Sequence, residues 1–252
     1  AGFPYRAAFT HWICDSVTMK WKVDVCFLRP ESATKLLAPY AASTCYVPHP
    51  VDCSFFKKGS EKSKDSRDER IVVGFLGRLI EGKGIHLLIE ALPYLPERVH
   101  LLIVGKGPML GRLQALTQEL HVEQRTKFLL PVPYADVPKT LNKLDVLALP
   151  SLETKYWIEL FGRVLIEAMA CEVPIVASRS GAIPEVVGNA GMLFSVGNRD
   201  ELISTLLRVV NDDSLGAEMA RRGRARALEL YDVPVIADRL AKTILKTLGN
   251  QA

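Results

Sequence analysis

Residues 159–178 read ELFGRVLIEAMACEVPIVAS, a stretch that predicts a loop, a helix and a strand in succession. Two carboxylates, Glu159 and Glu167, bracket a Phe-Gly turn. The helix is predicted to begin near Gly162 and to continue through Ala170, so Glu159 lies in the preceding loop. Glu167 lies one to two turns inside an otherwise apolar run, where an unpaired carboxylate is costly. We therefore expect Glu167 to meet a hydroxyl, an amide or a cation.

The spacing of these carboxylates is equally compatible with a structural role, in which Glu167 caps a neighbouring loop and Glu159 is a solvated loop acid. The sequence that follows favours a binding site. The β-branched run at 171–178 predicts a buried strand. Residues 180–187 (SGAIPEVV) then form a glycine turn, with Pro184 where a new helix would begin. This order of elements predicts a ligand-facing edge of a parallel sheet.

From residue 71 onward, short apolar runs alternate with helical patterns, which is typical of βαβ units. The pattern predicts an α/β fold with a doubly wound parallel sheet, followed by helices at 198–211 and 214–230 and an amphipathic segment at 233–248. Strands are expected near 71–76, 99–104, 126–130, 144–149, 173–177 and 191–194. Ligands bind such sheets at the carboxyl ends of the strands. The residues expected on that edge are Arg78, Gly105, Pro150, Glu159 and Ser178.

Several motifs together resemble the retaining, nucleotide-sugar-dependent glycosyltransferases of family 4, which have the two-Rossmann GT-B fold. The family's Glu-x7-Glu segment corresponds to residues 159–167, and its Gly-x-x-Pro-Glu-Val turn to 181–186. Residues 77–84 (GRLIEGKG) are similar to its Gly-Arg-x-x-x-x-Lys-Gly loop. Residues 104–108 resemble its second glycine turn. Residues 48–52 (PHPVD) are similar to its interdomain Pro-Asn-Gly-Val-Asp, with His49 in place of Asn and Pro50 in place of Gly. Each motif alone is weak, but their shared order makes the resemblance specific.

The resemblance implies a Rossmann-like sheet forming the C-terminal half of a GT-B fold. Residues 1–50 are expected to be a remnant of the acceptor-side N-terminal domain with the interdomain connector. Residues 51–232 are expected to be the donor-binding domain. Residues 233–252 are expected to be a helix that packs on the missing N-terminal domain. Because the connector comes early and the chain begins without Met, we expect a fragment or a split-gene subunit.

The resemblance also implies roles for individual residues. Arg78 and Lys83 are expected to act in catalysis by offsetting the charge on the leaving diphosphate without a metal. Glu167 is expected to bind the ribose hydroxyls, and Glu159 to contact the transferred sugar as a third catalytic residue. An isolated motif of this kind has an alternative interpretation, in which Arg78 pairs with a carboxylate and Lys83 is solvated. Further donor-binding residues are expected to be Gly77, Gly105, Phe161, Gly162, Arg163 and Gly181.

The implied reaction is hexosyl transfer with retention of configuration from a UDP- or GDP-sugar to a glycan or lipid-linked acceptor, as in polysaccharide biosynthesis. The leaving phosphate would help to deprotonate the acceptor on the same face, and no cofactor is expected. The alternatives are a nucleotide-sugar epimerase, a phosphorylase, or a non-catalytic regulatory module on the same fold. A glycosidase pair of carboxylates about 5 Å apart is disfavoured, because Glu167 is assigned to the nucleotide. A dehydrogenase is disfavoured because the third fingerprint glycine is lacking after Gly107.

Composition agrees with a globular protein: 252 residues, of which 48% are hydrophobic. The chain has no run near the ~20 apolar residues of a membrane span. Five cysteines without Cys-x-x-Cys spacing indicate neither a disulfide framework nor a zinc site, so the cytoplasm is the expected compartment. A net charge of +4 is compatible with a phosphate-bearing ligand or with peripheral membrane contact. Acidic residues interleave the basic ones at 57–70, which argues against nucleic-acid binding.

Further features depart from the family pattern. Glu172 replaces a usual Gly and Ala182 replaces another, so the turns lining the donor pocket are expected to differ in shape. The loop at 151–158 is longer than the commonest family loop. Its Trp157 either packs on a sugar face or anchors the loop, and anchoring is slightly favoured.

Near the start of the chain, residues 10–16 are expected to form a strand that ends in a polar turn.

Overall fold

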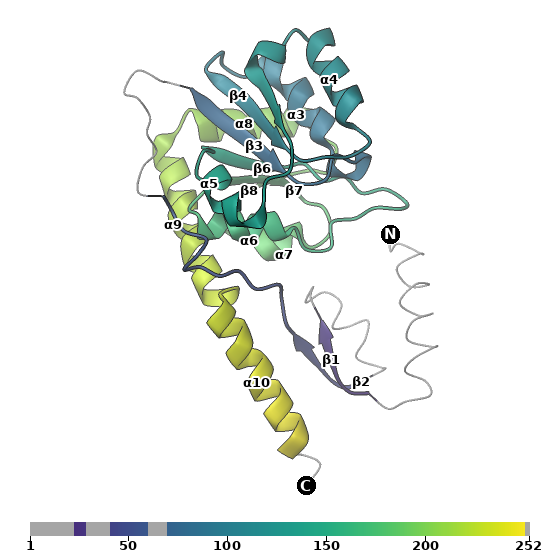
Figure 1. Ribbon diagram of the computed structural model, residues 1–252, viewed down its shortest axis with the longest axis vertical. Coiled ribbons are helices and arrows are strands. Elements are labelled where there is room, and N and C mark those ends of the chain that lie inside the picture. The colour runs from purple at the N-terminus through teal and green to yellow at the C-terminus, as the bar shows by residue number, and fades with distance from the viewer. Residues whose placement is uncertain (1–22, 29–40, 60–69, 250–252) are drawn as a thin grey trace. The chain divides into compact units, whose positions relative to one another are not determined.

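The computed structural model of this chain describes residues 23–28, 41–59 and 70–249 (Figure 1). The chain divides into two compact units, residues 51–232 and residues 1–50 with 233–252. The strand expected at 10–16 lies outside the described residues, as do residues 60–69 of the charged segment.

The larger unit is built on a parallel sheet in the order β5-β4-β3-β6-β7-β8, six strands among the described residues. The chain runs outward from β3 to β5 and returns to the other side of β3 at β6, which makes the sheet doubly wound as expected. All six expected strands are present. They are β3 (Ile71–Leu76), β4 (Val99–Val104), β5 (Thr126–Leu129), β6 (Val146–Leu149), β7 (Ile175–Ser178) and β8 (Met192–Phe194).

Two strands begin two residues later than the apolar runs predicted, because the preceding helices end with hydrogen-bonded turns. Leu144 N donates to Leu141 O at 2.9 Å, which delays the start of β6. Val173 N donates to Ala168 O at 2.9 Å and closes the end of the helix before β7. These residues are buried and apolar, so hydrophobicity alone does not separate them from the strands.

Helices cover both faces of the sheet (Figure 1). α3, α4 and α8 form one layer, and α6, α7 and α9 form the other. β6 and β7 are buried along their whole length because both faces are covered. The helices of this unit are α3 (Ile85–Ala91), α4 (Leu110–Glu119), α5 (Val137–Leu141), α6 (Arg163–Ala170), α7 (Ile183–Val187), α8 (Arg199–Val210) and α9 (Asp213–Leu230).

The two ends of the larger unit are joined to each other. Val51 N donates to Tyr231 O at 2.8 Å, and Cys53 N donates to an Asp232 carboxylate oxygen at 3.1 Å. Arg224 on α9 donates to the carbonyl oxygens of Cys53, Phe56 and Ala170. The first and last turns of the unit therefore close on the end of α6.

The smaller unit contains a parallel pair of strands, β1 (Val23–Leu28) and β2 (Ala41–Tyr46), and the helix α10 (Val233–Gly249). α10 forms where the amphipathic segment was predicted. The Cys45 Sγ and Thr243 Oγ1 atoms are 3.1 Å apart, and the Arg239 guanidinium lies 5.8 Å from the centroid of the Tyr46 ring. These contacts attach α10 to β2 within this unit.

Candidate functional site

The candidate site lies where the strand order reverses, at the carboxyl ends of β3 and β6. Arg78 follows β3, Gly105 follows β4, and Ser151 follows β6, so all three lie at one edge of the sheet. Ligands of doubly wound sheets bind at this position. Glu159 is ten residues beyond the end of β6 and returns to the edge through a loop, whereas Ser178 is the last residue of β7 itself.

The turns after β3 and β4 contact each other through their backbones. Leu79 N donates to Lys106 O at 2.9 Å, and Met109 N donates to Leu79 O at 3.0 Å. A Cβ atom at position 105 would overlap the carbonyl oxygen of Gly77. Gly105 is therefore required by the close approach of the two turns. Whatever ligand the turns bind, Gly105 has this structural role.

The two expected diphosphate-binding cations lie beside the same indole ring. Arg78 Cζ is 5.4 Å and Lys83 Nζ is 5.3 Å from the centroid of the Trp157 ring. Arg78 is exposed, and no described carboxylate lies within ion-pair distance of its guanidinium. Lys83 is only 13% exposed and pairs with Glu159. This arrangement is the reverse of the alternative in which Arg78 is paired and Lys83 is solvated.

Glu159 is 6% exposed, and one oxygen of its carboxylate is held from two sides. Lys83 Nζ lies 2.5 Å from Oε2, and Ser151 Oγ donates to the same atom at 2.9 Å. Ala182 N donates to the Glu159 carbonyl at 3.0 Å, which ties this loop to the turn after β7. The interpretation of Glu159 as a solvated loop acid is therefore wrong. Two residues with separate expected roles, Lys83 and Glu159, are in direct contact.

The turn after β7 is closed by a side chain to which no motif pointed. Gly181 N donates to Glu153 Oε1 at 2.7 Å, and Ser180 Oγ donates to Leu152 O at 3.2 Å. The loop after β6 and the turn after β7 thus form one hydrogen-bonded assembly at the edge of the sheet. Glu153 was missed because its partner is a backbone amide on another strand connection, which leaves no local pattern.

Glu167 on α6 is 9% exposed, and its Oε1 lies 3.5 Å from Nη2 of Arg163 one turn earlier. Arg163 is therefore the cation that was expected to meet this carboxylate. Burial raises the pKa of Glu167 above its ordinary value, and the Arg163 charge opposes part of the rise. Burial also raises the pKa of Tyr134 on the short 3₁₀ turn η6 (Tyr134–Asp136), a residue that no motif singled out, and the Arg163 charge opposes part of that rise.

Phe161, expected among the donor-binding residues, has its side chain in the core. It is 4% exposed, and its ring meets the Tyr231 ring edge to face at 6.0 Å between centroids. The next residue, Gly162, precedes the first turn of α6, where Leu165 N donates to Gly162 O at 2.8 Å. Burial of Phe161 fixes the point at which α6 begins and places its free backbone amides at the edge of the sheet.

An apolar hollow of about 340 Å³ adjoins Arg78. Its far wall comes from the segment after β5, which the sequence motifs did not include. The available signal was the strand predicted at 126–130 with prolines at 131 and 133 after it, because β5 pairs with β4 and ends at the same edge. The hollow is lined by Leu76, Gly77, Arg78, Val104, Gly105, Lys106, Pro131, Val132 and Val137.

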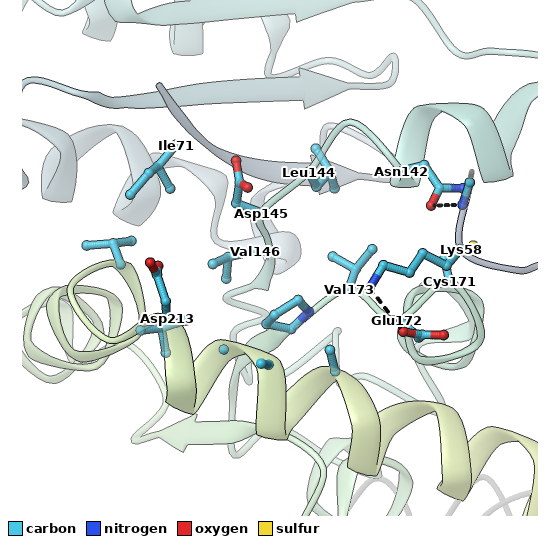
Figure 2. A pocket seen from close by; sticks show the side chains of 17 residues that line it. Lys58, Ile71, Asn142, Leu144, Asp145, Val146, Cys171, Glu172, Val173 and Asp213 are labelled. Carbon is cyan, nitrogen blue, oxygen red and sulfur yellow. Dashed lines mark hydrogen bonds and ion pairs between the residues drawn. The ribbon is translucent and has the colours of Figure 1, made fainter. Parts of the chain in front are cut away.

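A second cavity, of about 380 Å³, lies at the opposite edge of the sheet (Figure 2). It contains the first residues of β3 and β6, Ile71 and Val146, and Lys58 pairs with Glu172 beside it at 3.3 Å. Glu172 was expected to shape a turn of the donor pocket, and this expectation is wrong. Glu172 follows the end of α6, whereas the candidate site adjoins the beginning of that helix.

The described residues contain neither a metal-binding cluster nor a membrane-spanning helix. No group of three or more His, Cys, Asp or Glu side chains there is arranged to hold a metal ion. Over the same ranges, no helix has both the length and the apolar composition that crossing a bilayer requires.

Comparison of sequences relates this chain to curated glycosyltransferases. It is 31% identical over 222 residues to the GDP-mannose-dependent alpha-(1-6)-phosphatidylinositol monomannoside mannosyltransferase of Mycolicibacterium smegmatis, covering 85% of this chain and 57% of that protein. It is also 31% identical over 214 residues to the D-inositol 3-phosphate glycosyltransferase of Corynebacterium jeikeium, covering 76% and 50%. The chain thus spans about half the length of these curated relatives.

Solved structures show the same architecture. The structure of Anabaena HepE in complex with UDP and glucose superposes with a TM-score of 0.77 at 26% identity, over 88% of this chain and 63% of that one. The model of the family described as "Glycosyl transferases group 1" matches residues 57–226. The doubly wound sheet is therefore the expected half of a GT-B fold, and this chain belongs to the group 1 glycosyl transferases.

Proposed function

We propose that this chain is the donor-binding part of a retaining glycosyltransferase, which binds a nucleoside-diphosphate sugar and passes its hexosyl group to a glycan or lipid-linked acceptor. The observation that carries the proposal is the pair of cations, Arg78 and Lys83, at the carboxyl edge of the sheet. Family membership supports it, as do the UDP-glucose complex of the related Anabaena protein and the GDP-mannose dependence of the mycobacterial relative.

In the proposed complex, the diphosphate lies against Arg78, Lys83 and the first amides of α6. Breaking the glycosidic bond places additional negative charge on the diphosphate, and prearranged cations stabilise that charge. A helix N-terminus offers free N–H groups and a positive dipole end. Arg163 at the same end adds a further positive charge. The charges of the site therefore favour departure of the nucleoside diphosphate, which gains a negative charge as it leaves.

The two carboxylates are proposed to recognise different parts of the donor. Glu167 accepts hydrogen bonds from the two vicinal ribose hydroxyls. These hydrogen bonds replace its contact with Arg163. Glu159 contacts the transferred sugar through its second oxygen, while Oε2 remains bonded to Lys83 and Ser151. The nucleobase occupies the apolar hollow between the ends of β3, β4 and β5. Lys83 thus links the sugar end of the site to the diphosphate.

Retention of configuration is proposed because no side chain is assigned as a base on the far side of the sugar. The leaving phosphate instead takes the acceptor proton on the face from which it departs. The experiment incubates the chain with its preferred donor and candidate acceptors, alone and together with a separately made acceptor-side domain, and follows the first anomer formed by proton NMR. Retention predicts that this anomer has the donor configuration, and an inverted first product would contradict the proposal.

The preferred donor is found by thermal unfolding in the presence of UDP- and GDP-sugars, because a ligand that binds the native state raises the midpoint temperature. We expect either the UDP-sugars or the GDP-sugars to raise the midpoint temperature at concentrations at which the other series has no effect. A chain whose midpoint responds to no nucleoside diphosphate would instead be a non-catalytic module on this fold.

The diphosphate assignment is tested by changing each cation to Ala. Arg78→Ala and Lys83→Ala should each weaken binding of the nucleoside diphosphate by roughly 1.5–3 kcal/mol and leave the bare nucleoside almost unaffected. Because Lys83→Ala leaves the buried Glu159 carboxylate unpaired, the double variant with Glu159→Gln is measured beside it. Lys127→Ala, on the exposed side of β5, is the control. Equal losses for diphosphate and nucleoside, measured by titration calorimetry, would contradict the assignment.

A further inference from the structure

Trp157 is wedged between the loop after β6 and the glycine loop after β3. A Cβ atom at position 82 would overlap the indole ring, so Gly82 allows the ring to lie directly on the backbone of that loop. Leu152 N donates to Gly82 O at 2.8 Å, and Thr154 N donates to Trp157 O at 2.8 Å. The ring is therefore fixed by packing and by backbone hydrogen bonds on both sides.

The position of this ring brings two like charges together. Arg78 and Lys83 both lie within 5.4 Å of the ring centroid, a distance at which the negative face of an indole attracts a cation. Two neighbouring cations repel each other, and here the Glu159 carboxylate offsets the Lys83 charge. No described carboxylate does the same for Arg78. The indole is therefore the main described group that stabilises the Arg78 cation in its place.

The polar atom of the indole takes no part in this arrangement. Trp157 Nε1 is buried and has no hydrogen-bond partner among the described residues. A buried N–H without a partner costs free energy, so this atom does not account for a Trp here. The contacts made by Trp157 are those of its aromatic ring. A phenyl ring would keep the aromatic face and remove the unpaired N–H.

We propose that Trp157 is a positioning residue of the donor site, whose ring holds Arg78 and Lys83 side by side as the pair that receives the diphosphate. The inference rests on the proposed function and adds a residue that acts on the diphosphate only through the two cations. It also accounts for Gly82 inside the glycine loop, because any larger residue would displace the ring.

The first test compares Trp157→Leu with Trp157→Phe, using UDP with uridine and GDP with guanosine as probes. Loss of the ring beside two cations should weaken diphosphate binding about tenfold in Trp157→Leu, whereas Trp157→Phe should stay within about threefold of the unchanged chain. Binding of the nucleosides should not change. The matched control is Tyr156→Leu, which removes an exposed ring beside Lys155 in the same loop and should leave diphosphate affinity unchanged.

The second test keeps the shape of the ring and changes only its electrostatics. Tryptophan is replaced biosynthetically by its mono-, di- and trifluorinated analogues, which progressively weaken the attraction of the ring for cations. Affinity for UDP or GDP should fall stepwise with fluorination. Trp12 and Trp21 are labelled too, so the Trp157→Phe chain is labelled in the same way as the control, and its affinity should not change. This test holds even if Trp157→Leu does not fold.

The outcomes separate the two proposals. If the unchanged chain binds nucleoside diphosphate no better than nucleoside, the proposed function fails. If Arg78→Ala loses diphosphate affinity while Trp157→Leu and full fluorination do not, the proposed function stands and the role of Trp157 is overturned. If Trp157→Phe loses as much affinity as Trp157→Leu, the aromatic face is not the relevant feature, and the role is likewise overturned.

Discussion

The two carboxylates of the site, Glu159 and Glu167, have similar burial but different surroundings. Glu159 is neutralised by Lys83 and accepts a hydroxyl hydrogen bond from Ser151. Among the described residues, the partner of Glu167 is the exposed Arg163 at 3.5 Å, and burial raises the pKa of Glu167. A carboxylate that pays a desolvation cost without full compensation weakens the fold, which is typical of residues kept for binding.

If Glu167 holds the ribose, Glu167→Gln should reduce affinity for a ribonucleoside diphosphate and leave affinity for its 2′,3′-dideoxy analogue nearly unchanged. Glu159→Gln should act only when a sugar is attached to the diphosphate. Calorimetry with the three ligands provides the comparison. If Glu159→Gln weakened the sugar-free diphosphate as much as Glu167→Gln does, the two roles would have to be exchanged.

The raised pKa of Glu167 predicts a pH-dependent effect on stability. Above the native pKa the group is ionised in both states, and the native state carries the cost of burying the charge. Below the ordinary value of 4.5 it is protonated in both states, and the cost vanishes. Glu167→Gln should therefore raise the free energy of unfolding at pH 7, by roughly 1.4 kcal/mol per unit of pKa rise.

This gain should shrink as the pH falls through the native pKa of Glu167 toward 4.5. Urea unfolding between pH 4 and 8 measures it, with Glu123→Gln at an exposed position as the control. A gain that stayed constant over this range would show that ionisation of Glu167 is not its source.

At the scale of elements, the end of α6 carries a local conflict. Val173 N donates to Ala168 O and Glu172 N donates to Met169 O, a pair of hydrogen bonds that requires the left-handed conformation between helix and strand. Glu172 adopts it with φ of 57°. Glycine takes this conformation without a steric cost, whereas a residue with a Cβ atom does not. The physical reason for a family glycine at this position is thus the cap and not the donor pocket.

Glu172→Gly should relieve this strain and, compared with Glu172→Ala, give a free energy of unfolding higher by about 1 kcal/mol. Both variants lose the exposed pair with Lys58, so their difference isolates the backbone conformation. Chemical denaturation of the two variants measures it. Because Glu172 lies at the edge opposite the candidate site, nucleotide affinity should not change in either; equal stabilities would show that the backbone there bears no strain.

At the scale of the whole molecule, every residue assigned to the donor falls within 51–232, and the ends of that unit are hydrogen-bonded to each other. A chain shortened to these residues should therefore fold and bind nucleoside diphosphate with unchanged affinity. Circular dichroism and calorimetry test this, and Arg78→Ala in the shortened chain provides the matched control. A folded 51–232 that no longer bound nucleotide would require a contribution from residues 1–50 or 233–252.

Much of the larger unit could be predicted from the sequence, because its signals are local. Alternation of short apolar runs with helical patterns located all six strands, and the 163–170 helix was predicted at its observed bounds. The motifs also predicted which loops meet at the carboxyl edge, since parallel strands bring those ends together. Strand starts were missed where buried turns are as apolar as the strands themselves.

The contacts between separate loops could not be predicted from the sequence, because they depend on the tertiary structure. Pairing of Lys83 with Glu159, closure of Gly181 by Glu153, and the ring of Trp157 between two cations each join segments with no shared periodicity. A sequence pattern records which residues one element needs. Which side chains neutralise each other depends on distances across the sheet edge, and these exist only once β3, β6 and β7 are side by side.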